Sequence, residues 1–143
     1  ARGALPATEA EETMSTSYGM RRDLRSTYEE ALKTVPEALQ AEGFGVLTEI
    51  DVKATLKKKL DVDFRRYMIL GACNPPLAHQ ALQADPLVGL LLPCNVVVYE
   101  EEGGAVVSFV NPKEMFKVVD IPELQTVADE VDAKMKRALD RLG

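Results

Sequence analysis

Two valine-rich runs joined by a glycine turn constrain the fold of this chain more than any other stretch. Residues 95–100 and 105–110 are short and apolar, and Glu102-Gly103-Gly104 lies between them. A glycine pair between two such runs is a strong signal of a β-hairpin. Residues 64–72 predict a further strand, which is continuously apolar from Met68 and therefore expected to be central. An antiparallel sheet is the expected centre of the fold.

Long helical patterns flank the predicted strands. From Tyr28 to Gly43 apolar residues recur at helical spacing, with a predicted capping box of Ser26 and Glu29 at the start. A second long pattern runs from Pro122 to the C-terminus. The sequence therefore predicts an α+β fold, with one mainly antiparallel sheet of about five strands packed by two long helices. Further strands are expected at 14–20 and 44–50, and short inserted helices after Asp51, after Asn74 and around residues 86–89.

The totals favour one domain and exclude several kinds of partner. Residues 14–143 carry the pattern of a single domain, whereas residues 1–13 are small and acidic and predict either a disordered lead-in or a short surface helix. A net charge of −6 and the absence of Trp argue against nucleic-acid binding. No apolar run approaches the ~18 residues of a membrane span. Two cysteines in such a chain suit a reducing compartment, so we expect a cytoplasmic protein.

The predicted hairpin carries apolar side chains on both faces. Val96-Val97-Val98 and Val106-Val107 place valines on each side of the sheet. Since two long helices would cover one face only, the other must be solvated, filled by a ligand or covered by a partner. We therefore expect a homodimer in which the second subunit covers the bare face.

Both cysteines precede an asparagine, in Cys73-Asn74 and Cys94-Asn95. Asn74 is predicted to cap a helix whose positive end should lower the pKa of the Cys73 thiol. If the two strands pair antiparallel, both thiols lie at one end of the sheet, whereas a parallel pairing would separate them. His79, the only histidine, lies in the capped helix. The candidate ligand-binding residues are therefore Cys73, Asn74, His79, Cys94 and Asn95.

Three interpretations of this cluster remain open. The first is a binding module or sensor that captures a small anion, a metal ion or a sulfur species. The second is a thiol-dependent enzyme acting on a small redox or sulfur substrate, with an asparagine amide as oxyanion donor. The third is a structural or interaction protein, since free cysteines pack as small hydrophobes and asparagine before proline favours turns. Two cysteines and one histidine fall short of a four-ligand zinc site, so neither a metal nor a cofactor is assigned.

Three motifs resemble those of a known family, the domain of unknown function 302. They stand unbroken in this chain as Gly43 to Val46, Ile69 to Pro75 and Leu91 to Asn95. The resemblance extends from about Met14 to the C-terminus. It implies a curved antiparallel sheet with helices, of the TATA-binding-protein-like type, and commonly a dimer. It brings no biochemical activity with it, and a fold of that type does not imply DNA binding.

Overall fold

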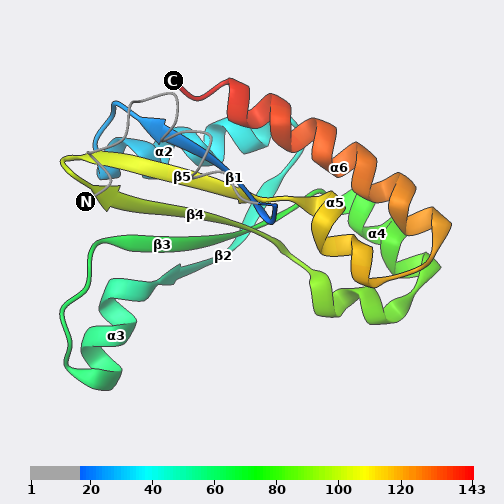
Figure 1. Ribbon diagram of the computed structural model, residues 1–143, viewed down its shortest axis with the longest axis horizontal. Coiled ribbons are helices and arrows are strands. Elements are labelled where there is room, and N and C mark those ends of the chain that lie inside the picture. Colours follow the sequence, from blue (N-terminus) through cyan, green and yellow to red (C-terminus); the bar gives the residue numbers. More distant parts are fainter. Residues whose placement is uncertain (1–16) are drawn as a thin grey trace.

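Five strands form one antiparallel sheet, as the sequence predicts, and their order in the sheet is β1-β5-β4-β3-β2 (Figure 1). The computed structural model describes residues 17–143. The hairpin between β4 and β5 turns at Glu102 and Gly103, whose φ angles of 49° and 81° suit the favoured two-residue turn. The strands are β1 (Gly19–Leu24), β2 (Gly45–Asp51), β3 (Tyr67–Cys73), β4 (Cys94–Glu101) and β5 (Gly104–Val110).

Within residues 17–143, helices cover one face of this sheet and leave the other open (Figure 1). α2 packs on the central strands, and α6 packs against α2, α4 and α5. Alternate residues of β4 and β5, including Val96, Val98 and Phe109, are fully buried beneath them. None of the described helices is long and apolar enough to cross a bilayer. The helices are α2 (Tyr28–Ala41), α3 (Val52–Leu60), α4 (Pro75–Ala84), α5 (Pro112–Met115) and α6 (Pro122–Asp140), with 3-10 turns η2 (Pro86–Leu91) and η3 (Phe116–Val118).

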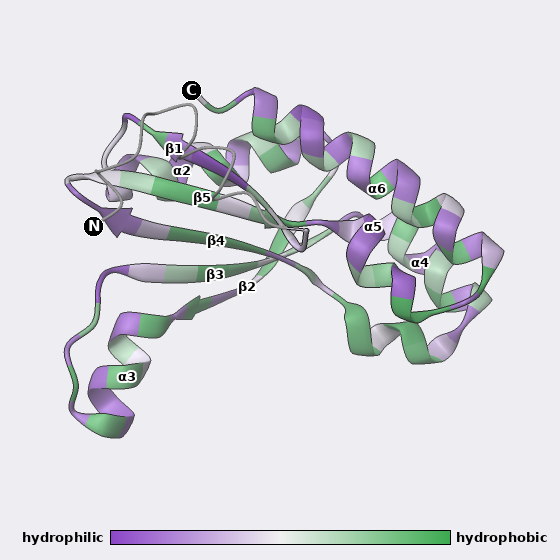
Figure 2. Ribbon diagram, in the orientation of Figure 1, coloured by the Kyte–Doolittle hydropathy of each residue, from purple (hydrophilic) through white to green (hydrophobic). Residues whose placement is uncertain are grey.

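The hydropathy of the elements follows their position in the fold. Figure 2 shows hydrophobic residues concentrated along the central strands, whereas hydrophilic residues recur along the outward side of α6. The buried stripe of α6 includes Leu124, Val131 and Met135, as its helical spacing predicts. The core therefore lies between the covered sheet face and the two long helices, which confirms the predicted α+β class.

The start of α2 differs from the predicted cap by one residue. Thr27, rather than Ser26, is the N-cap, and its Oγ1 accepts a hydrogen bond from the Glu30 backbone N–H at 3.1 Å. The sequence holds two overlapping capping boxes, and the structure uses the second. Glu29 is thereby left to pair with Arg66 at 3.0 Å, which ties α2 to the residue that precedes β3.

β1 lies further along the chain than the predicted strand at 14–20. Residues 14–16 and the predicted lead-in at 1–13 lie outside the described residues, and the strand itself begins at Gly19. It includes two arginines, which the apolar pattern did not favour. The strand accommodates them because Arg21 pairs with Glu101 at 3.0 Å and Arg22 donates to the Leu139 carbonyl at 3.1 Å.

α3 stands away from the body of the molecule (Figure 1). Asp51 caps it as predicted, with Oδ1 accepting from the Ala54 backbone N–H at 2.9 Å. Its apolar stripe of Val52, Leu56 and Leu60 has little to pack against, and within the described chain none of its residues is buried. The reason is topological, because β2 is an edge strand and the described residues place no further strand beyond it.

Candidate functional site

The two cysteines lie at the same end of the sheet because β3 and β4 pair antiparallel. Ala72 lies opposite Cys94, and Cys73 follows Ala72 directly. The pairing decides between the two arrangements that the sequence left open. Both cysteines are free; Cys94 is buried and Cys73 is half-buried.

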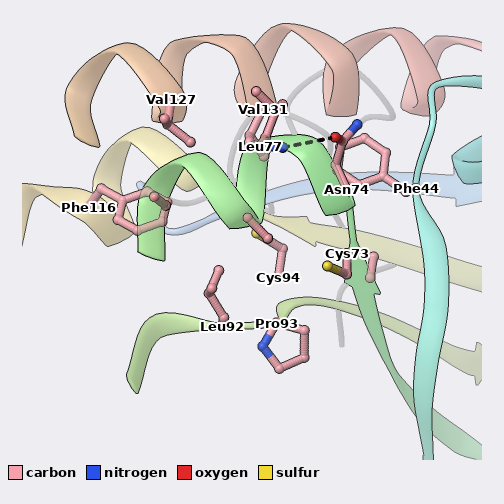
Figure 3. Close-up of a pocket in the computed structure, with 13 residues that line it drawn as sticks. Phe44, Cys73, Asn74, Leu77, Leu92, Pro93, Cys94, Phe116, Val127 and Val131 are labelled. Atoms are coloured by element: carbon pink, nitrogen blue, oxygen red, sulfur yellow. Dashed lines mark hydrogen bonds between the residues drawn. The ribbon is translucent and has the colours of Figure 1, made fainter. Parts of the chain in front are cut away.

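A small cavity brings both cysteines together beneath α4 (Figure 3). Its volume is about 20 Å³, which is the space of roughly one water molecule. Among the described residues, its lining is apolar except for the two thiols and the Asn74 amide. The apolar lining comes from Phe44, Ala72, Leu77, Ala78, Ala81, Leu92, Pro93, Phe116, Val127 and Val131.

Asn74 holds two helices at the edge of this cavity. Its Oδ1 accepts from the Leu77 backbone N–H at 3.4 Å, which caps α4 as predicted, and its Nδ2 donates to the Glu42 carbonyl at 3.5 Å. Glu42 is the C-cap of α2. The next residue, Gly43, has a φ of 87°, and a Cβ there would lie 3.1 Å from the Asn74 Nδ2. Glycine therefore satisfies both the backbone and the space beside the amide.

Gly71 lies in β3 beside the cavity, and its lack of a side chain lets Thr48 and Pro93 approach the backbone closely. A Cβ at this position would contact Thr48 Oγ1 and would lie 2.7 Å from Pro93 Cγ. Pro93 follows a cis peptide bond with Leu92, and both residues line the cavity. The three sequence motifs thus meet in space, one from the end of α2, one from β3 and one from the entry to β4.

The family model for "Domain of unknown function DUF302" matches residues 20–142. The chain belongs to the DUF302 family. The crystal structure of the uncharacterized conserved protein DUF302 from Bacillus stearothermophilus is similar, with 31% identity, a TM-score of 0.82, and coverage of 90% of this chain and 100% of that one. No curated protein matches the chain. Likeness to the TATA-binding-protein type stays a prediction.

In this DUF302 domain burial raises the pKa of both thiols. The pKa of Cys94 rises to about 12, mainly through burial and to a lesser extent through the neighbouring Cys73. Burial also raises the pKa of Cys73, opposite to the lowering expected from the N-terminus of α4. Asn74 occupies the α4 N-terminus by bonding the Leu77 N–H, so the cap is made by the amide and not by a thiolate. Both cysteines are therefore protonated thiols near neutral pH.

The DUF302 fold separates two predicted members of the cluster from the cavity. Asn95 follows Cys94 in β4, and successive strand side chains point to opposite faces. Asn95 is exposed and lies on the open face with Tyr67 and Tyr99. His79 is exposed on α4 and is not among the described residues that line the cavity. Cys73, Asn74 and Cys94 are the three that the structure brings together.

Sequence reasoning missed the aromatic and aliphatic wall of the cavity. Phe44 could have been found, since it lies within the Gly43 to Val46 motif. Phe116, Val127 and Val131 had no such signal, because each looks like an ordinary core residue of a helix far along the chain. Within residues 17–143, no group of three or more His, Cys, Asp or Glu side chains could hold a metal ion.

Proposed function

We propose that this DUF302 protein binds one small, thiophilic ligand between the side chains of Cys73 and Cys94. The observation that carries the proposal is that both thiols line one cavity of about 20 Å³. A nucleotide, sugar or amino acid needs a far larger site. The ligand is therefore of the size of a single ion or a few atoms.

The side chains that line the cavity restrict the chemical class of the ligand further. The described lining holds no carboxylate, amine or imidazole, so a hard cation or a small anion would find no charged partner. Water is a poor occupant, because it needs two to four polar partners and the Asn74 amide already bonds Leu77 and Glu42. Sulfur is the available donor, and sulfur prefers soft, polarizable acceptors.

Binding without turnover fits the thiols better than catalysis does. A thiol enzyme needs a thiolate at working pH, because the thiolate is the nucleophile. Burial raises the pKa of both Cys73 and Cys94, which disfavours that form. These raised pKa values favour the proposal of a receptor for a ligand that is itself reactive toward thiols.

Arsenite tests this proposal, because one arsenic(III) centre condenses with two thiols only when both can reach it. Each sulfur–arsenic bond forms as one hydroxide on arsenic leaves as water with the proton of the thiol. We expect the reduced full chain to retain one arsenic per chain in native mass spectrometry and to gain thermal stability. Cys73→Ser and Cys94→Ser should each lose this retention, whereas His79→Ala should keep it.

A matched variant separates loss of binding from loss of fold. Cys94→Ala keeps an apolar side chain in the buried position, and circular dichroism should show the same secondary structure as the parent protein. Retention of arsenic by either single-cysteine variant, at the level of the parent protein, would contradict a site made of both sulfur atoms.

We also propose that a second copy of the chain covers the open face of the sheet. The supporting observation is a hollow of about 350 Å³ on that face, lined in part by Tyr67, Val97 and Tyr99. Light scattering should give the mass of a dimer, and Val97→Arg should reduce it to that of a monomer. Val118→Arg is the control, because Val118 is equally apolar and 76% exposed but lies in η3, away from the sheet. A monomeric parent protein would contradict this proposal.

We propose a cytoplasmic location on the basis of the same thiols. Both cysteines are free, and a reducing compartment keeps thiols in that state. Fractionation of cells expressing the natural gene should recover the protein with the cytosolic fraction, and recovery outside it would contradict the proposal.

A further inference from the structure

We propose that the cavity between β3, β4 and α4 is a two-coordinate site for copper(I), bound by the sulfur atoms of Cys73 and Cys94. The inference rests on the proposed function and names the ligand class of the same site. It is argued from the donor atoms, from their placement on two strands and from the charge of the surroundings.

The donor set selects a soft ion of low coordination number. Cysteine sulfur favours copper(I), zinc and iron–sulfur clusters. A structural zinc ion takes four ligands, and clusters are held by four cysteines. The described residues bring no third cysteine, histidine or carboxylate to Cys73 and Cys94. Copper(I) is the member of this group that two thiolates satisfy, with the metal on a line between them.

The placement of the two cysteines suits a bridge by a single ion. They come from neighbouring antiparallel strands, with Cys94 opposite the residue that precedes Cys73. Figure 3 shows the Cys73 sulfur pointing toward the side of the cavity where Cys94 lies. The space of about 20 Å³ admits one ion stripped of water. Leu77, Leu92 and Phe116 form an apolar wall, and the Asn74 amide is the one other polar side chain of the described lining.

One helix N-terminus follows directly on the site and favours the charge that copper(I) binding would create. Two thiolates and one copper(I) carry a net charge of −1, which is costly in an apolar cavity unless it is compensated. α4 has 10 residues and begins at Pro75, directly after Cys73-Asn74. Its N-terminus carries the positive end of the helix dipole. On binding, each thiol releases its proton to solvent as its sulfur–copper bond forms, and no electron moves because the metal enters as copper(I).

An anaerobic titration of the reduced full chain with copper(I), against bicinchoninate as competing chelator, tests this inference. Ultraviolet absorption from sulfur-to-copper charge transfer should rise linearly and stop at one equivalent, and X-ray absorption should show two sulfur neighbours. Cys73→Ser and Cys94→Ala should each lower the affinity at least a hundredfold. His79→Ala should leave it unchanged, because His79 is exposed outside the described lining.

The other outcomes separate this inference from the proposed function. Arsenite retention without copper(I) binding would overturn the copper site and leave a thiophilic-ligand protein standing. Copper(I) binding that survives both cysteine variants would overturn the assignment of the ligands. Zinc bound as tightly as copper(I) would overturn the two-coordinate site. Failure of both probes would overturn the inference and the proposed function together.

Discussion

Cys73-Asn74 and Cys94-Asn95 are the same dipeptide in two different settings. In the first, a strand ends and a helix begins, so the asparagine turns to cap α4 and to reach α2. In the second, a strand begins, so alternation directs the cysteine into the core and the asparagine to the open face. The two thiols consequently share a cavity, whereas the two amides lie on opposite sides of the sheet.

The difference in burial between the thiols predicts their order of reactivity. Iodoacetamide should alkylate Cys73 faster than Cys94, and both more slowly than a free cysteine at pH 7, because the thiolate is the reacting form. With the pKa of Cys94 raised to about 12, its thiolate fraction falls by roughly a thousandfold relative to an ordinary thiol. Peptide mass analysis of the native protein between pH 7 and 10 measures both rates, and faster labelling of Cys94 would contradict the prediction.

A methyl group at position 71 should destabilise the protein. Gly71→Ala places a Cβ against Thr48 Oγ1 and 2.7 Å from Pro93 Cγ, at a position that is paired with strands on both sides. We expect a loss of about 1–3 kcal/mol in the free energy of unfolding, as for other overpacked sites. Gly45→Ala is the control, because nothing lies within 4 Å of a Cβ there. Urea titration measures both, and equal losses would contradict the steric argument.

At the scale of elements, the C-terminus of α2 is the junction of the fold. Gly43 and Phe44 close the helix with two backbone hydrogen bonds of 3.0 Å, in the pattern of a Schellman motif. The Glu42 carbonyl accepts from Asn74, and the Glu42 carboxylate reaches α6. One residue thus connects α2 to α4 through its backbone and to α6 through its side chain.

The pKa of Glu42 makes this junction sensitive to acid. Hydrogen bonds from Arg137 at 2.8 Å and Arg141 at 3.0 Å lower the pKa of the Glu42 carboxyl below its ordinary value. A carboxyl whose pKa is lower in the folded state stabilises the protein above its unfolded pKa of about 4.3 and loses that effect as the pH falls through the folded value. Glu42→Gln should therefore lower the Tm at pH 7.

The pH dependence is the decisive part of the Glu42 prediction. The difference in Tm between the parent protein and Glu42→Gln should be largest near neutral pH and should shrink as the pH falls through the lowered pKa of the Glu42 carboxyl, because both side chains then become neutral. Differential scanning calorimetry across this range measures it. A difference that stays constant with pH would show that the ion pairs are not its cause.

Turn residues, cap residues and helical periodicity in the sequence correctly predicted the elements that depend only on neighbouring residues. The Glu102-Gly103 hairpin, the Asn74 and Asp51 caps and the long helix from Pro122 were all predicted in place. The start of α2 was not, because Ser26 and Thr27 offer overlapping capping boxes and the choice depends on Arg66, far along the chain. β1 was displaced because its arginines are satisfied by ion pairs that only the tertiary fold creates.

The candidate site also has features that local sequence could predict and features that depend on the tertiary fold. The cysteines share one end of the sheet because β3 and β4 pair antiparallel. The sequence allowed both an antiparallel and a parallel pairing and could not choose between them. The raised pKa of the thiols could not be predicted, because burial by Phe116 and Val131 depends on how α6 packs over α4. The absence of Asn95 from the cavity could have been predicted, because strand alternation alone directs its side chain to the face of the sheet away from Cys94.

At the scale of the whole molecule, α3 projects from the domain and lies outside its core. It buries none of its described residues, and the strands on either side of it are already paired, with Asp51 opposite Met68. Replacing residues 53–63 by a short glycine-serine linker should change the free energy of unfolding by less than about 1 kcal/mol, as expected for a segment outside the core. Thermal denaturation measures this, and loss of cooperative unfolding would contradict it.

Because α3 lies outside the core, it is also a suitable place to insert foreign sequence. The chain leaves the sheet at Asp51 and returns at Tyr67 to the neighbouring strand, so foreign sequence inserted at the far end of this arm would lengthen the arm without parting the two strands. The thiol cavity lies at the opposite end of β3, where Cys73 ends the strand that Tyr67 begins. A fluorescent reporter grafted into the arm would stay clear of the cavity while remaining joined to it through a single strand.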